Sequence, residues 1–153
     1  MAEHAKELFD RFLASGTFLD AAPFGSGHIH KTWLIRTAGQ DKDDYILQQI
    51  NNNVFRNVPE LQENLERVTV HLKKKISAIP GSDVRRECLQ MIWSREGKSW
   101  INDSEGNFWR LFVFIPDHIS YDIVDSPEKA YEGGKAIGRF QALLSDLPGK
   151  PLH

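Results

Sequence analysis

The chain has 153 residues, 41% of them hydrophobic, which is enough to bury the core of one ordinary domain. A formal net charge of −2 excludes a polybasic nucleic-acid-binding or membrane-binding chain, and it also excludes a highly charged disordered one. The single cysteine, Cys88, excludes an internal disulfide and a zinc site built on cysteines. No apolar run reaches the ~18 residues of a membrane span, so we expect a cytoplasmic protein.

The first part of the chain predicts a helix followed by three strands. Apolar residues recur at helical spacing over residues 3–14, and Ser15-Gly16 ends that run. Three extended segments follow, at residues 17–24, 29–37 and 45–50. Because Gly25-Ser26-Gly27 and the polar turn at 39–44 are short connections, we expect these strands to form an antiparallel meander.

The middle of the chain predicts one long helix and three more strands. Pro59 stands at a first helical position, and apolar residues then step by 3 or 4 until Ile79-Pro80-Gly81 ends the helix. Further strands are expected at residues 88–93, 98–101 and 107–115, with a hairpin turn at 103–106. The last strand is apolar on both faces, so we expect it to be central and covered on both sides.

A final helix is predicted from Pro127, with Ser126 as its N-cap. Gly133, Gly134 and Gly138 lie within it, and each costs about 1 kcal/mol relative to alanine. Close packing of another element would explain that cost. The order of elements predicts an α+β fold with a twisted antiparallel sheet of five or six strands, one long packed helix and helices at both ends.

Two short motifs allow alternative interpretations. The glycines at 25 and 27 can form a loop whose backbone N–H groups lie over nucleotide phosphates, but spacing alone favours a plain turn. A dinucleotide-binding fold is excluded, because the glycines lie between two strands rather than between a strand and a helix. His28 and His30 share a strand face without a nearby third ligand, which favours exposed histidines over a metal site.

Five separated blocks, taken in order, resemble one family. The blocks are Gly25–Trp33, Tyr45–Phe55, Glu63–Leu72, Trp109–Ile115 and Gly138–Leu144. They resemble the N-terminal lobe of aminoglycoside phosphotransferase/choline kinase-like sugar kinases, closest to the N-acetylhexosamine 1-kinase branch. Some relatives carry the label of mucin-desulfating sulfatase, but the sequence after Cys88 lacks the Cys/Ser-x-Pro-x-Arg motif of a sulfatase. The resemblance implies a protein-kinase-like small lobe over residues 1–147 and a linker over 148–153 toward an absent C-terminal lobe.

The resemblance also implies roles for individual residues. The loop over the ATP phosphates would be formed by Gly25, Ser26, Gly27 and His28. The hinge whose backbone meets the adenine would include Phe114, Ile115 and Asp117. Gln48 stands where many kinases carry a phosphate-binding lysine, and its amide supplies no positive charge. Either Glu66 or Glu63 would be the helix acid that orients the residue at position 48.

What the resemblance implies for function is phosphoryl transfer from ATP, with Mg²⁺, to a hydroxyl of a sugar such as an N-acetylhexosamine. In that family the catalytic and metal-binding aspartates lie in the C-terminal lobe, and this sequence contains no His-x-Asp or Gly-Asp loop. We therefore expect a truncated or fragmentary nucleotide-binding lobe that is inactive alone, binds nucleotide weakly and holds no catalytic residue or metal. The alternative is a non-catalytic interaction module. Apolar residues over 127–147 also predict a homo-oligomer through the final helix.

Overall fold

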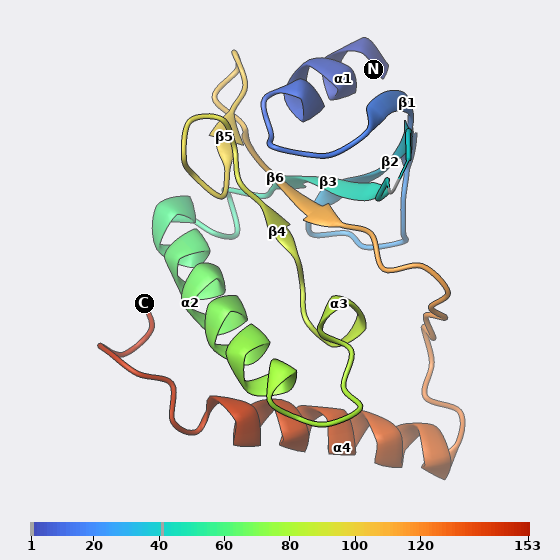
Figure 1. Ribbon diagram of the computed structural model, residues 1–153, viewed down its shortest axis with the longest axis vertical. Coiled ribbons are helices and arrows are strands. Elements are labelled where there is room, and N and C mark those ends of the chain that lie inside the picture. Colours follow the sequence, from blue (N-terminus) through green and yellow to red (C-terminus); the bar gives the residue numbers. More distant parts are fainter. Residues whose placement is uncertain (1, 41) are drawn as a thin grey trace. The chain divides into compact units, whose positions relative to one another are not determined.

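The computed structural model describes residues 2–40 and 42–153, which form an α+β fold (Figure 1). In this part of the chain the helices are α1 (Ala2–Asp10), α2 (Val58–Ser77), α3 (Val84–Glu87) and α4 (Pro127–Leu144). The strands are β1 (Thr17–Pro23), β2 (Lys31–Ala38), β3 (Tyr45–Ile50), β4 (Met91–Ile92), β5 (Ile101–Asn102) and β6 (Phe108–Val113). The predicted fold class is confirmed, and none of the described helices has the length and apolar character to cross a membrane.

One antiparallel sheet contains all six strands. Its order is β1-β2-β3-β6-β4, and β5 also pairs with β6. The predicted meander of β1, β2 and β3 is therefore confirmed. The central place predicted for the last strand is confirmed as well, because β6 pairs with β3, β4 and β5.

The described chain divides into two compact units. The first contains the chain up to Glu66 together with Leu89–Phe114 and His153, and so holds α1 and the sheet. The second contains Arg67–Cys88 and Ile115–Leu152, and so holds α3 and α4. Helix α2 contributes its first part to the first unit and its last part to the second.

The core of the first unit lies between α1 and one face of the sheet. It consists of Ala5, Leu8, Phe9, Phe12, Ile35, Tyr45, Leu47, Ile101, Trp109 and Leu111. Tyr45 is 1% exposed, and its hydroxyl accepts a hydrogen bond from the Ser15 N–H at 2.8 Å, so the ring is buried while its polar end is satisfied. Four of the apolar positions that predicted an N-terminal helix therefore cover the sheet, but α1 ends at Asp10 rather than near residue 14, and Leu13 is exposed.

The second unit has a smaller core between α4 and the last part of α2. Leu72, Ile76 and Cys88 are buried there, and Leu143 and Leu144 of α4 pack against them. The predicted cap of α4 is confirmed, because the Ser126 hydroxyl accepts from the Lys129 N–H.

Two expectations for the second half of the chain are wrong. The strands expected at 88–93 and 98–101 shrink to two residues each, and residues 84–87 form α3. Asp83 begins that helix by accepting a hydrogen bond from the Arg85 N–H at 2.9 Å, a cap that the sequence analysis missed. The close packing expected at the helical glycines is also absent, because a Cβ on Gly133, Gly134 or Gly138 would meet no described atom within 4 Å apart from the adjoining residues and backbone of its own helix.

Candidate anion-binding site on the sheet

The glycine loop joins β1 to β2 and is open to solvent. The Phe24 N–H donates to the Thr32 carbonyl at 2.9 Å and closes the hairpin, after which Gly25 adopts a φ of +80°. That left-handed conformation favours glycine. The loop lines a cavity of about 380 Å³ together with residues 28–33 and Asn51. Ser26 and His28 are exposed, so the backbone of the loop is accessible to a ligand.

A row of polar side chains crosses the sheet behind this loop. Thr32, Gln48 and Arg110 lie directly opposite one another on β2, β3 and β6. The Gln48 Nε2 donates to the Thr32 hydroxyl at 3.1 Å, while the Gln48 Oε1 accepts from the Arg110 Nε and Nη2 at 2.9 and 2.6 Å. Gln48 therefore holds two of the three guanidinium nitrogens of Arg110.

Helix α2 completes the row from the other direction. The Arg110 Nη1 donates to the Gln62 Oε1 at 3.0 Å, and the Gln62 Nε2 donates to the carbonyl and hydroxyl of Ser99 at 3.2 and 3.1 Å. Gln62 is only 1% exposed. Both polar atoms of the Gln62 amide are therefore hydrogen-bonded. The guanidinium of Arg110 is held by Gln48 on one side and by Gln62 on the other.

Arg110 is a cation without a carboxylate partner. Burial lowers the pKa of its guanidinium to about 10, so the group remains charged at neutral pH. Its hydrogen-bond acceptors are the amide oxygens of Gln48 and Gln62, and no carboxylate of the described residues forms an ion pair with it. The guanidinium also lies over the Phe112 ring, 5.2 Å from its centroid, but neither an amide nor a ring carries a formal negative charge. A partly desolvated cation in such surroundings attracts an anion, because an anion would supply the missing counter-charge.

His30 lies in the segment that joins the glycine loop to β2. Its Nδ1 accepts the Asn51 N–H at 3.0 Å, and its ring stacks on Phe55 with the ring centroids 5.3 Å apart. The Asn51 bond requires an unprotonated Nδ1. Burial first and the charge of Arg110 second lower the pKa of His30. The charge of Arg110 therefore acts on His30, which lines the same cavity as the glycine loop.

We predict that His30 makes the fold sensitive to mild acid. The unfolded chain protonates His30 near its ordinary pKa of about 6.5, whereas the folded chain does so only at a lower pH. Stability contributed by the neutral ring is therefore complete above about pH 6.5 and is lost as the pH falls. A His30→Asn variant keeps an acceptor for Asn51 but cannot titrate. Urea unfolding measures the free energy of unfolding of the wild type and His30→Asn at about pH 7.5 and pH 5.5. Between these two pH values the wild type should lose more stability than His30→Asn, and equal losses would contradict the assignment.

The structure places the remaining predicted residues in different surroundings. Phe114 lies in the first unit, where its N–H donates to the Asp44 carbonyl at 2.8 Å and its ring meets Phe24 edge-on. Ile115 and Asp117 belong to the second unit, and Asp117 has a φ of +54°. The predicted hinge therefore coincides with a boundary between the two units.

The two acids predicted on this helix, Glu63 and Glu66, are not the residues for which a hydrogen bond to Arg110 is seen; Gln62 is. Glu63 faces His153, with the Glu63 Oε2 and the His153 Nε2 3.2 Å apart. Glu66 is half-buried on the same helix. The helix side chain that reaches the polar row is Gln62, whereas the orienting role of Glu66 or Glu63 stays a prediction.

The sequence analysis missed Arg110, although a signal for it was present. Arg110 occupies the face of β6 that also carries Phe108 and Phe112, and a single cation between two aromatic residues is unusual in a central strand. Pairing with Gln48 becomes visible only once the register of β3 and β6 is known. No protein-family model matches the chain.

Proposed function

We propose that this chain forms the nucleotide-binding lobe of an ATP-dependent phosphotransferase that acts on a hydroxyl of a sugar such as an N-acetylhexosamine. The observation that carries the proposal is the Arg110 guanidinium, which bonds to amide oxygens, lies over the Phe112 ring and has no carboxylate partner among the described residues, in the same sheet as the open glycine loop. A protein-kinase-like small lobe has these parts in this order: a glycine-rich hairpin, a third strand and a helix that reaches it.

In this proposal Arg110 supplies the positive charge that Gln48 lacks. Transfer of a phosphoryl group depends on holding the phosphates in place and on neutralising their charge, and a guanidinium can bind a phosphate through two parallel N–H bonds. Gln48 and Gln62 become positioning residues, because each fixes a different edge of the guanidinium. In this proposal the phosphate-binding cation lies on β6, whereas many kinases carry it on the third strand, which here is the neighbouring β3.

The other expected contacts complete the nucleotide site. Backbone N–H groups over residues 25–28 would cover the phosphates, and the backbone around Phe114, Ile115 and Asp117 would meet the adenine. Mg²⁺ would neutralise part of the phosphate charge. We assign to these residues the holding of ATP and make no assignment of an acceptor site for the transferred phosphoryl group.

We predict weak but phosphate-dependent binding of ATP. One lobe covers only one side of the nucleotide, so a dissociation constant in the ~mM range is expected. Arg110→Met should weaken ATP binding at least about tenfold, because it removes a charge-assisted contact of about 1.5–3 kcal/mol. The matched control is Arg139→Met on α4, where the side chain is paired with Glu87. Calorimetry that gives the same ATP affinity for the wild type and Arg110→Met would refute the proposal.

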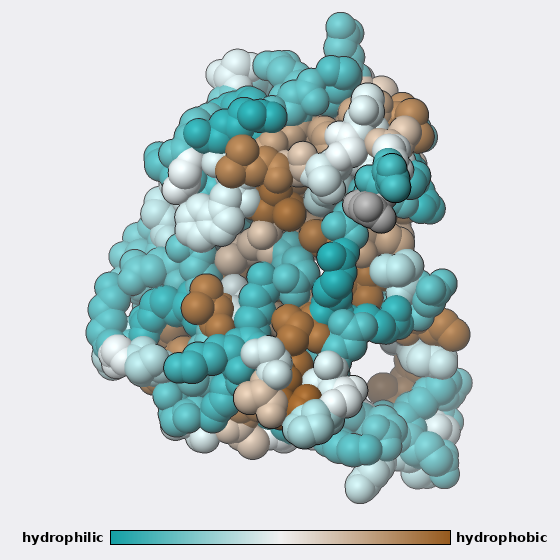
Figure 2. Space-filling model, in the orientation of Figure 1, coloured by the Kyte–Doolittle hydropathy of each residue, from teal (hydrophilic) through white to brown (hydrophobic). Residues whose placement is uncertain are grey.

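A second candidate function rests on a different surface. Helix α4 exposes Tyr131, Ile137 and Phe140 by 69%, 63% and 48%. Figure 2 shows hydrophobic atoms exposed among hydrophilic ones over the segment that Figure 1 labels α4. This surface favours an interaction module, the alternative raised by the sequence, and it is compatible with nucleotide binding elsewhere on the chain.

A further inference from the structure

A second concave region lies on the opposite face of the sheet from Arg110. Lys31, Gln49 and Trp109 are directly opposite one another on β2, β3 and β6, each one residue away from a member of the row formed by Thr32, Gln48 and Arg110. Side chains alternate between the two faces of a sheet from one residue to the next. The two regions are therefore separate sites that share the same three strands.

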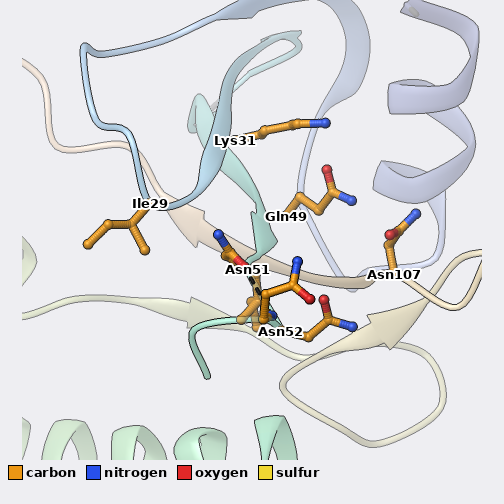
Figure 3. A pocket seen from close by; sticks show the side chains of 8 residues that line it. Ile29, Lys31, Gln49, Asn51, Asn52 and Asn107 are labelled. Carbon is orange, nitrogen blue, oxygen red and sulfur yellow. Dashed lines mark hydrogen bonds between the residues drawn. The ribbon is translucent and has the colours of Figure 1, made fainter. Parts of the chain in front are cut away.

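This region consists of two adjoining cavities of about 270 and 430 Å³, which we call the amide groove. Both cavities are lined by Lys31, Gln49 and Asn107. Asn51, Asn52 and Asn53 line the first, while Trp33 and Trp109 line the second. Figure 3 shows Lys31, Gln49 and Asn107 reaching from separate segments toward the same side of the sheet. The combined space is large enough for a monosaccharide or a short oligosaccharide.

Several polar side chains of the amide groove have no partner among the described residues. The side-chain amides of Gln49 and Asn52 and the ammonium group of Lys31 form no hydrogen bond within this part of the chain, although Gln49 is half-buried. An amide carries a donor and an acceptor in one plane, a spacing that suits two neighbouring hydroxyl groups. A half-buried amide without a partner is expected where a ligand completes its hydrogen bonds.

The aromatic wall of the groove is held in a fixed orientation. The rings of Trp33 and Trp109 meet with their centroids 5.2 Å apart and tilted by 42°. The Trp109 Nε1 donates to the Asp103 carboxylate at 2.8 Å, which prevents the buried indole from turning. Because the two indoles touch, they leave no slot for a flat ring between them, and Trp33 remains half-buried with one side toward the groove.

The charges of the groove favour a neutral ligand. Asp103 is 3% exposed and already accepts hydrogen bonds from Glu105, Asn107 and Trp109, so it supports the walls rather than a ligand. The carboxylates of Asp103 and Glu105 offset the positive charge of Lys31. A phosphate would therefore find little net attraction here, in contrast to the face that carries Arg110.

We propose that the amide groove binds a neutral carbohydrate ring non-covalently. The C–H face of the ring packs against Trp33, and its hydroxyl groups bond to the amides of Gln49 and Asn52 and to Lys31. This inference does not depend on the proposed nucleotide site. A sugar held here lies on the opposite sheet face from Arg110, so the groove is a binding subsite rather than the place of phosphoryl transfer.

The test is a titration of the full chain with N-acetylglucosamine and, separately, with methyl β-glucoside. Binding is measured as a change in tryptophan fluorescence. A saturable change below about 100 mM is expected for at least one of the two sugars, because small neutral ligands bind a single groove weakly. Gln49→Leu should abolish the change, and Gln141→Leu on the exposed face of α4 should leave it unaltered. Asn52→Ala, in an exposed turn, should weaken it severalfold and serves if Gln49→Leu fails to fold.

Other outcomes overturn the inference. No saturable change with either sugar, or a change that survives both groove substitutions, means that the groove does not bind carbohydrate. Binding of inorganic phosphate or adenosine that Gln49→Leu abolishes assigns the groove to another ligand class and also contradicts the proposal. Arg110→Met should leave the sugar titration unchanged, so failure here is distinguishable from failure of the nucleotide site.

Discussion

Arg110→Met should lower the free energy of unfolding by about 2 kcal/mol, because the change leaves two half-buried or buried amide oxygens without their donor. The unpaired amide oxygen of Gln62 costs more free energy than that of Gln48, because Gln62 is only 1% exposed and water does not readily replace the lost donor. Removing the partly desolvated charge offsets only part of this loss, as is usual when one member of a buried polar network is deleted.

Removing three members of the network should restore part of the stability. A triple variant with Arg110→Met, Gln48→Met and Gln62→Leu replaces their polar side chains by apolar ones of similar size. We expect it to be more stable than Arg110→Met but less stable than the wild type, because the buried Ser99 carbonyl and hydroxyl lose their Gln62 donor. Urea unfolding of the wild type, the single variant and the triple variant measures both effects. A single variant as stable as the wild type would contradict the network described for Arg110.

Helix α4 is expected to mediate association of two copies of the chain. One side of the helix packs on α2 in the second unit through Leu143 and Leu144, while Tyr131, Ile137 and Phe140 stay exposed. Leaving about 400 Å² of apolar surface uncovered forgoes roughly 10 kcal/mol of gross burial before the costs of association. A two-fold contact is the simplest cover, because it needs only one self-complementary patch.

Phe140→Glu should convert that dimer into a monomer. A carboxylate at the centre of an apolar contact loses its hydration without gaining a partner, which disfavours association by several kcal/mol. Light scattering over a concentration series compares the wild type with Phe140→Glu, and Gln141→Glu provides a control with the same change of net charge at an exposed polar position of α4. A wild type that stays monomeric at the highest concentration, with its helical content intact, would contradict this prediction.

The sequence predicted the longer elements, in which apolar residues recur at regular spacing. The helix from residue 58 shows five apolar residues at helical spacing, and β2 and β3 show long β-branched or aromatic runs, so their positions were predictable within a few residues. The short elements were not. Helix α3 has four residues, which is too few for a periodic signal, and its Asp83 cap is a local hydrogen bond rather than a pattern.

The candidate site was predictable only in its local part. The glycine loop is visible in the sequence because its residues are consecutive. Arg110, Gln48 and Gln62 come from two strands and a helix up to 62 positions apart, and they meet only through the register of β3 with β6. The helical glycines are a related case, because their energetic cost predicts close packing that the described residues do not show.

We propose that Arg110 and the glycine loop bind nucleotide phosphates together. The most direct measurement is the change of backbone and arginine side-chain NMR shifts of the full chain on addition of ATP, compared with adenosine. We expect ATP, but not adenosine, to shift the Arg110 Nε–H and the amides of residues 25–28 along one shared binding curve. Shifts of the same size with adenosine, or ATP-dependent shifts that leave both the loop and Arg110 unmoved, would contradict the account.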